Sequence, residues 1–478
     1  MELQTIPIAD GDVADRYIVY RPLLGAAFVA NRAMADLTRA IVARRAAEAT
    51  AIERLPGAPE AREGVPGADR AAEGSGAPAR FLDRIGFLAP DPPPPALRRT
   101  FKPVTAVLLL TNQCQLRCTY CYAAAGALPA RRLSVDLGCR AIDHVSVNAS
   151  ELGYDHFEVA FHGGGEPTFA WSVLQHCTRH ARGKTLPAEI TLTSNAVWSR
   201  RQCDWISTNI DHLSLSVDGD VALQDRQRPF ASGRGSADIV LRNLATLDGR
   251  GKAYGLRLTA TAPWVQLPAA VGFLCATTAC RHMQVEPAFN AGRGGHGMPT
   301  SADCDAFADA FLEAFDVAAD AGCSLTCSAA RPGTVAASFC GAPYDALIVN
   351  ADGHLGTCYE IDNAGHPLAG ISTIGCIDGA EVRVNHAARD RLHGLLDARR
   401  AACEGCFSYH SCAGDCYARR FQPGVDGHLA HGPRCDMNRR ILRELLLRLI
   451  EMSGGVWRMP TPAAPMQASG EPGEIPVG

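Results

Sequence analysis

The stretch TNQCQLRCTYCYA, from Thr111 to Ala123, places three cysteines at the spacing C-x3-C-x2-C directly after the apolar run VTAVLLL. Three thiolates on one loop can hold three irons of a four-iron cubane and leave the fourth iron open to another ligand. Two alternatives stay open for these residues alone: a zinc ion completed by a distant residue such as His162, and three cysteines that are merely buried. The role of the loop therefore depends on what fills the missing fourth position.

Composition limits the classes of protein to consider. The chain has 478 residues and a net charge of -4, which is enough length for a large core and two or three domains, without a charge excess that would indicate a nucleic-acid partner. Its first residues, MELQTIPIADGDVADRY, carry acids where a signal peptide has basic residues. No apolar run approaches the roughly 20 residues of a membrane span. We therefore expect a cytoplasmic protein with no nucleic-acid or membrane partner.

The cysteines are too numerous for an ordinary cytoplasmic chain. There are 19 of them, and an odd number in a chain without a secretion signal favours metal ligation over a disulfide framework. They concentrate in two dense groups, Cys114 to Cys121 and Cys403 to Cys435. The spacing thus predicts two separate metal-binding regions.

Strand-like apolar runs alternate with helical patterns from Val104 onward, which predicts a parallel sheet of six strands in an α/β fold. Polar residues follow nearly every strand, at the edge where barrels and open parallel sheets build their active sites. These strand-end residues are Thr111, Asn112, His162, Gly163, Ser194, Asn195, Asp218, Thr259 and Glu286. We expect the active site at this edge of the sheet.

The turn FHGGGEPTF, residues 161–169, follows the second predicted strand. Its glycines let backbone groups approach a ligand closely, and Glu166 offers a carboxylate to an ammonium group. An ordinary strand-to-helix turn is the alternative. Preceded by C-x3-C-x2-C, this GG-x-P turn resembles the radical S-adenosylmethionine family over about Phe101 to Asn290. The resemblance implies a partial (β/α)6 TIM-like barrel.

The resemblance also implies which group fills the fourth position. The amino and carboxylate groups of S-adenosyl-L-methionine would bind the open iron of a [4Fe-4S] radical SAM cluster, and reductive cleavage would yield a 5'-deoxyadenosyl radical. The glycine turn would bind the amino end of the methionine part, and two polar residues would bind the ribose. A guanidinium would bind the carboxylate through its bidentate fork. Polar strand ends also cap helices, which is the alternative for the ribose pair and the residues after it. The implied cluster ligands are Cys114, Cys118 and Cys121, and the implied cofactor-binding residues are Tyr120, Gly164, Gly165, Glu166, Pro167, Ser194, Asn195, Ser216, Asp218 and Arg228.

The C-terminal cysteines follow the spacing C-x12-G-x4-C and then C-x2-C-x5-C-x3-C-x18-C. Seven cysteines in this order resemble the SPASM extension of the same family, which implies two auxiliary [4Fe-4S] clusters. A zinc ribbon is the alternative, although seven thiols are too many for one zinc. The first cluster lacks one ligand, which would be Cys327, Cys323 or an open iron position. By the family's interleaved pattern, the first cluster takes Cys340, Cys358 and Cys416, and the second takes Cys403, Cys406, Cys412 and Cys435.

Four regions are expected along the chain. Residues 1–95 form a small α+β N-terminal unit that weakly resembles winged-helix modules, which bind leader peptides by adding a strand to a sheet; a structural cap on the barrel is the alternative. Within it, residues 52–80 are rich in Pro, Gly and charge and are predicted to be a disordered insertion. Residues 96–325 form the barrel, 326–452 the cysteine-rich iron-sulfur domain, and 453–478 a disordered tail.

These features together predict a radical SAM/SPASM maturase that abstracts hydrogen from a ribosomally synthesised peptide to form a cross-link or thioether or to epimerise a residue. Formation of formylglycine, as in anaerobic sulfatase maturation, is the alternative, and a multi-cluster iron-sulfur electron carrier is an alternative of another class. The expected partners are a precursor peptide and an electron donor such as flavodoxin or ferredoxin. The sequence does not identify the peptide, the residue attacked, the bond formed, the hydrogen donor or the oligomeric state.

Overall fold

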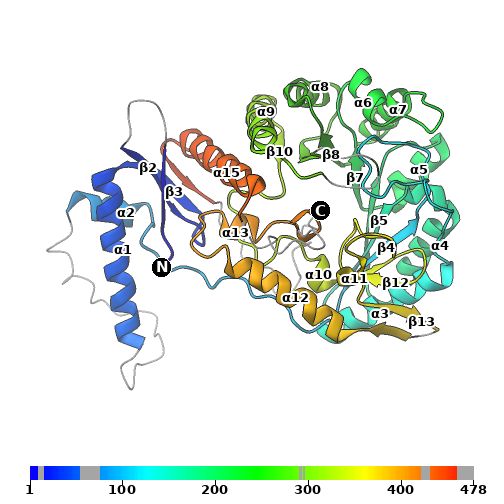
Figure 1. Ribbon diagram of the computed structural model, residues 1–478, viewed down its shortest axis with the longest axis horizontal. Helices are drawn as coiled ribbons and strands as arrows, with labels where there is room; N and C mark the ends of the chain where they lie inside the picture. The colour runs from blue at the N-terminus through cyan, green and yellow to red at the C-terminus, as the bar shows by residue number, and fades with distance from the viewer. Residues whose placement is uncertain are drawn as a thin grey trace.

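The computed structural model describes residues 1–8, 15–53, 76–289, 293, 297–379, 381–420 and 431–459. These residues build one eleven-stranded sheet and one four-stranded sheet. Figure 1 shows the large sheet surrounded by helices, with the small sheet and its helices α1 and α2 at the opposite end of the molecule.

Six parallel strands form the centre of the large sheet, and they pair in the order in which they occur along the chain. The predicted α/β class with a large parallel sheet is confirmed. A seventh short strand, β10 (Ser324–Thr326), continues the parallel pairing beyond β9. The six are β4 (Thr105–Thr111), β5 (Phe157–Gly164), β6 (Ala188–Ser194), β7 (His212–Ser216), β8 (Gly255–Ala260) and β9 (His282–Pro287).

The helices between these strands begin and end where the sequence supplies caps. Ser134 accepts a hydrogen bond from the Leu137 N–H at the start of α3, and Gly153, at a φ of 75°, ends that helix. Ser199 and Gln202 form a capping box at the start of α5. The helices are α3 (Val135–Leu152), α4 (Trp171–Arg182), α5 (Arg200–Asn209), α6 (Val221–Gln227), α7 (Ala237–Asp248), α8 (Leu267–Thr277) and α9 (Ser301–Asp320).

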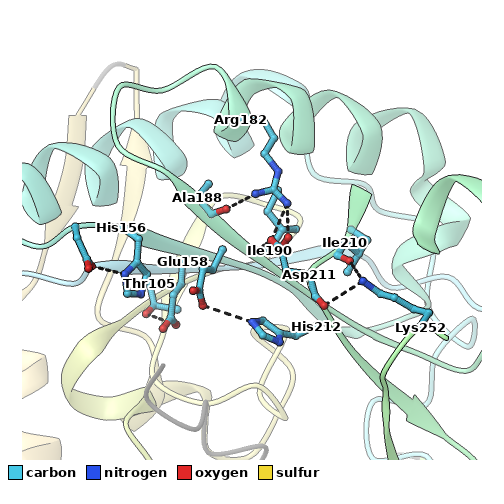
Figure 2. A network of polar contacts seen from close by, with 12 residues as sticks. Thr105, His156, Glu158, Arg182, Ala188, Ile190, Ile210, Asp211, His212 and Lys252 are labelled. Carbon is cyan, nitrogen blue, oxygen red and sulfur yellow. Dashed lines mark hydrogen bonds and ion pairs between the residues drawn. The ribbon is translucent and has the colours of Figure 1, made fainter. Parts of the chain in front are cut away.

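Polar contacts hold the amino ends of the central strands together (Figure 2). Arg182 donates to both carboxylate oxygens of Asp211, at 2.8 and 2.6 Å, and Asp211 in turn accepts from the Ile190 N–H of β6 at 2.7 Å. The Thr105 hydroxyl of β4 donates to Glu158 of β5 at 2.9 Å. This edge is therefore fixed by internal pairing, and the opposite, carboxyl edge is left to build a site.

The C-terminal region is joined to the central sheet by backbone hydrogen bonds. Strand β11 (Ala346–Val349) lies parallel to β4, and β12 (His354–Gly356), β13 (Gly375–Asp378) and β14 (Glu381–Val384) follow it antiparallel. The six-stranded core is consequently open at β4 rather than closed onto β9. The later helices are α10 (Ala342–Asp345), α11 (Ala369–Ser372), α12 (His386–Ala401), α13 (Tyr409–Cys412), α14 (Tyr417–Arg420) and α15 (Pro433–Met452).

The four-stranded sheet has a buried residue layer on each face. It contains β1 (Gln4–Pro7), β2 (Arg16–Arg21), β3 (Ala26–Asn31) and β15 (Val456–Arg458). Ile18 and Tyr20 of β2 belong to the main hydrophobic core, together with residues of α15. Val19 and Phe28 face the other way, into a smaller core with residues of α1 (Arg32–Glu53) and α2 (Ala77–Arg84). The N-terminal unit is therefore packed onto the rest of the chain through one face of its sheet.

Two predicted boundaries differ from the structure. The tail expected to be disordered from residue 453 supplies β15, which pairs antiparallel with β3, and the rest of it, 460–478, lies outside the described residues. Trp457 is buried in the main core, and the Met459 N–H donates to the Gly25 carbonyl at 2.6 Å. A three-residue strand is too short to show alternation, so its burial depends on a distant partner. Helices α1 and α2 enter the predicted 52–80 insertion at either end, and residues 54–75 lie outside the described residues.

No helix in the described part of the chain has both the length and the apolar character needed to cross a membrane.

The burial of Trp457 yields a stability prediction. We expect Trp457→Ala to lower the free energy of unfolding by about 3–5 kcal/mol, because it removes a large side chain from the core and leaves a cavity. Chemical denaturation of the purified protein measures the change. Truncation after Met459 keeps β15 and should leave the stability unchanged, whereas truncation after Met452 should reproduce the loss. A Trp457→Ala protein as stable as the wild type would contradict the assignment of β15 to the core.

Candidate functional site

A cavity of about 200 Å³ opens at the carboxyl ends of the central strands. The three cysteines of the loop after β4 lie on one wall, and the glycine turn after β5 lies beside them. Eleven predicted site residues line this one cavity, which is the gathering that the strand-end pattern predicts. They are Cys114, Cys118, Tyr120, Cys121, Gly164, Gly165, Glu166, Ser194, Asn195, Ser216 and Arg228.

The cysteine loop is held by backbone hydrogen bonds to the segment that follows α6. The Arg117 N–H donates to the Pro229 carbonyl at 2.7 Å, and the Thr119 N–H donates to the Gln227 carbonyl at 2.9 Å. Arg293 also donates to the Cys118 carbonyl at 2.9 Å. The loop therefore keeps its shape through contacts that do not use the thiols.

The thiols themselves occupy a buried site. Burial raises the pKa of Cys114 to about 12, with further increases from the Glu166 carboxylate and the Cys118 thiol. Burial also raises the pKa of Cys118 to about 11, while the Arg228 cation opposes the shift. A thiolate at such a position needs a cation to offset its lost solvation. The donor set thus suits a positively charged metal group.

The glycine turn lies directly against the cysteine loop. Gly164 has a φ of 75°, which favours glycine, and a Cβ on Gly165 would lie 2.2 Å from the Gln113 carbonyl oxygen. The Glu166 N–H donates to the same carbonyl at 2.9 Å. Only glycine allows the two backbones this close approach, and the turn leaves a cradle that side chains would otherwise fill.

Glu166 anchors the turn to the end of β6. Its carboxylate accepts from the Ser194 hydroxyl at 2.7 Å, the Asn195 N–H at 2.9 Å and the Thr168 hydroxyl at 2.7 Å. Burial raises the pKa of Glu166, and these hydrogen bonds oppose the shift. The predicted contact of Glu166 with an ammonium group stays a prediction, since the structure shows the residue in a positioning role.

Tyr120, Asp218 and Arg228 form a second buried group. The Tyr120 hydroxyl donates to Asp218 at 2.5 Å, and Arg228 donates to the Tyr120 hydroxyl at 2.6 Å and lies 3.5 Å from Asp218. Asp218 lies behind the cavity wall rather than on it, and so does Pro167, which begins a buried 3-10 turn. For these two residues contact with a cofactor stays a prediction, and the structure shows each enclosed by neighbouring chain.

The far wall of the cavity carries charged residues that were not predicted as site residues. Arg419 donates to Glu286 of β9 and to Glu360, each at 3.0 Å. Arg257 and His162 line the same wall, and burial lowers the pKa of His162 to about 3, which keeps the imidazole neutral. The strand-end pattern had placed Glu286 and His162 at this edge. Arg419 lies within the C-terminal cysteine motif, and nothing in its local sequence indicates a partner on β9.

The C-terminal cysteines lie in two groups, and their assignment to two auxiliary clusters stays a prediction. Burial raises the pKa of Cys358 well above its usual range, and the Glu360 carboxylate and the Cys416 and Cys340 thiols add to this shift. For Cys412 the pKa is raised first by burial, then by Asp415 and by the thiols of Cys435, Cys403 and Cys406. Arg399 donates to the Cys435 sulfur at 3.2 Å. The thiols of Cys340, Cys358 and Cys416 therefore lie near one another, and those of Cys403, Cys406, Cys412 and Cys435 form a second group.

Among the described residues, no three His, Cys, Asp and Glu side chains are placed to hold a single metal ion. The fit of an iron-sulfur cluster rests instead on the donor chemistry: three half-buried thiols beside a glycine cradle at the cavity, and two further groups of three and four thiols.

Known proteins resemble the chain in sequence and in fold. No family model matches it. The Fe-coproporphyrin III synthase of Methanosarcina barkeri (strain Fusaro / DSM 804) is 28% identical over 159 residues, which are 33% of this chain and 37% of that protein. The structure of native anSMEcpe with bound AdoMet aligns with a TM-score of 0.58 at 16% identity, over 73% of this chain and 99% of that one. SuiB of Streptococcus suis bound to precursor peptide SuiA aligns with a TM-score of 0.47 at 14% identity, over 87% of this chain and 96% of that one.

The chain therefore has the fold of the radical S-adenosylmethionine enzymes, and the family resemblance predicted from its cysteines is confirmed at the level of the fold. Within that class it shares its fold with anSMEcpe, an anaerobic sulfatase-maturating enzyme of the SPASM type.

The anchoring of the glycine turn can be tested at Glu166. Glu166→Gln places an amide N–H₂ where a carboxylate oxygen accepts a hydrogen bond, at a cost of about 1–3 kcal/mol. We expect the affinity for S-adenosylmethionine to fall roughly 5- to 150-fold by equilibrium binding, with the iron content unchanged. Thr168→Val removes one of the hydrogen bonds and serves as the milder control. Unchanged affinity in Glu166→Gln would show that the turn does not depend on this anchor.

Proposed function

We propose that this chain is a radical SAM/SPASM maturase that abstracts hydrogen from a ribosomally synthesised peptide. The observation that carries the proposal is the single cavity that joins the three-cysteine loop, the glycine turn and a charged wall drawn from both the central sheet and the C-terminal region. An electron carrier with several clusters needs no cavity beside its cysteine loop, so that alternative is disfavoured.

Cys114, Cys118 and Cys121 would hold a [4Fe-4S] cluster, with S-adenosyl-L-methionine beside the glycine turn. When bound, these two groups supply a 5'-deoxyadenosyl radical by one-electron cleavage of the sulfonium. The residues of the chain orient the cofactor and keep water out: Glu166 fixes the turn, and Asp218 fixes Tyr120 and Arg228 on the wall. Two auxiliary [4Fe-4S] clusters belong at the two C-terminal groups of thiols, and a flavodoxin or ferredoxin is the proposed electron donor.

A peptide substrate agrees with the structural comparison. One structure of anSMEcpe contains AdoMet and a peptide, Kp18Cys, and aligns with a TM-score of 0.56. The same likeness supports formylglycine formation as the second candidate. The alignment with anSMEcpe covers 73% of this chain, so the likeness does not extend over the whole chain.

We assign recognition of the precursor's leader segment to the N-terminal unit. Strand β15 already pairs with β3, and in the described residues β1 pairs with β2 alone. The Ile8 N–H donates to the Arg16 carbonyl at 3.0 Å, and hydrogen-bonded pairs alternate along an antiparallel ladder. The backbone groups of Thr5 therefore point away from β2. A peptide that adds a strand to this sheet would pair with Thr5.

The cofactor assignment is tested by Cys118→Ala. We expect this variant, reconstituted without oxygen, to lose reductive formation of 5'-deoxyadenosine, because one iron of the first cluster loses its thiolate. Three cubanes contain about twelve irons, and replacing all three loop cysteines should lower the measured iron by roughly a third. Wild-type turnover in Cys118→Ala would contradict the assignment of the loop cysteines to the cluster. A wild-type protein that contains zinc and only about four irons would contradict the assignment of two auxiliary clusters to the C-terminal cysteines.

The peptide-binding edge is tested by Thr5→Pro. Proline removes the outward N–H and is tolerated on edge strands, so a hydrogen bond worth about 0.5–1.5 kcal/mol is lost and precursor affinity should fall roughly 2- to 12-fold. Thr5→Val keeps the N–H but lacks the hydroxyl that accepts from Arg39 at 2.8 Å, and it should bind normally. Deleting residues 1–95 is a poor test, because it removes three strands of the sheet and would uncover the residues of α15 in the main core. Equal affinity of Thr5→Pro and the wild type for the precursor would exclude pairing at β1.

A further inference from the structure

The predicted first auxiliary cluster has three cysteine ligands, Cys340, Cys358 and Cys416, and needs a fourth. The two other cysteines that the sequence offers, Cys323 and Cys327, have neighbours of their own. The Cys323 thiol donates to the Cys280 carbonyl at 3.6 Å at the start of β10, the edge opposite the cavity. Cys327 is 1% exposed, forms a β-bridge with Ala330 and packs in the main core. Burial raises the pKa of its thiol, the Glu286 carboxylate raises it further, and the Arg434 and Arg419 guanidinium groups lower it.

A carboxylate lies where the fourth ligand is missing. Glu360 follows Cys358 by two residues, and its N–H donates to the Cys358 sulfur at 3.4 Å. Cys358 and Cys416 pack in one apolar cluster, and Cys340 packs against the cluster that contains Tyr359. The Glu360 side chain is 8% exposed and lines the cavity. Glu360 therefore contacts one of the three cysteines through its backbone and reaches the cavity with its side chain.

The orientation of this carboxylate is fixed by the same element that carries one of the thiols. Arg419 follows Cys416 by three residues on α14 and donates to Glu360 Oε1 at 3.0 Å. Its other terminal nitrogen donates to Glu286 on β9 at 3.0 Å, so the guanidinium cannot rotate freely. Ligating carboxylates are commonly held by a hydrogen bond of this kind from the next layer of residues.

We propose that the Glu360 carboxylate completes the first auxiliary cluster, with Cys340, Cys358 and Cys416 as the other three ligands. The inference rests on the auxiliary clusters of the proposed function. One iron of this cluster is then bound by oxygen and borders the cavity, while the other three are bound by sulfur. The pairing with Arg419 offsets the burial of the ligand's charge. An iron with an oxygen ligand at a cavity wall is also the iron most accessible to a substrate group.

The test uses the full chain with Cys114, Cys118 and Cys121 replaced by alanine, reconstituted with iron-57, so that only the auxiliary clusters contribute. These hold about eight irons. We expect Mössbauer spectra to resolve one oxygen-ligated iron among them, and Glu360→Cys to convert it to the all-sulfur pattern. Glu360→Gln should weaken the binding of the iron that Glu360 ligates. Loss of this iron leaves a three-iron cluster and lowers the iron count by about one per chain. Glu286→Gln removes the charge of the other carboxylate that pairs with Arg419 and should keep the oxygen-ligated iron.

The spectrum of the chain with an intact Glu360 decides the question even if the Glu360 variants fail to assemble. About eight irons that are all sulfur-ligated would overturn the Glu360 assignment while leaving the auxiliary clusters in place. An oxygen-ligated iron that persists in Glu360→Cys would also overturn it, because the oxygen would then come from another group. If the variant without the loop cysteines holds no iron at all, both the Glu360 assignment and the two auxiliary clusters of the proposed function are overturned. Formation of 5'-deoxyadenosine by the wild type would still test the cluster at Cys114, Cys118 and Cys121 separately.

Discussion

The row of backbone hydrogen bonds between β4 and β11 is the contact on which the rest of the architecture depends. Residues 346–349 pair with residues 105–108 in parallel register, which joins the C-terminal region to the strand that precedes the cysteine loop. Parallel pairing fixes both directions and register, so β11 and β4 end at the same edge. Without this row, Glu360 and Arg419 would not lie on the wall of a cavity whose opposite wall carries the loop cysteines.

The sequence predicts the site better than it predicts the wall that faces it. Cys114, Gly165 and Ser194 follow strands of clear apolar pattern, and parallel strands bring their carboxyl ends to one edge, so proximity follows from topology alone. Arg419 and Glu286 are separated by more than a hundred residues, and their 3.0 Å contact depends on how two regions pack, which local periodicity does not encode. The same reason explains β15: the pattern of three residues carries no signal, and only the uncovered side of β3 gives them a partner.

Charge pairing shapes the cavity as much as packing does. Arg228 lies against Asp218, and Arg419 against Glu286 and Glu360, so both of these guanidinium groups have a carboxylate beside them. Unpaired, any of these groups would carry a large desolvation cost. Because these carboxylates are already paired with arginines, the charged side chains of the walls are held in place before a ligand binds. They can then interact with a ligand's charges without first having to move. Glu166 shows the same principle with neutral donors, since it is held by a serine, a threonine and a backbone N–H.

The position of β15 also has a consequence for how the chain is made. A ribosome releases β3 several hundred residues before it releases Trp457, so throughout synthesis the side of β3 that β15 covers stays unpaired. Exposed strand edges are where chains associate wrongly, and large chains tend to complete their domains from the N-terminus onward. This chain cannot finish its first sheet until nearly its last described residues emerge. Closure of the small sheet therefore reports that the intervening regions, with all the cysteines, have been synthesised.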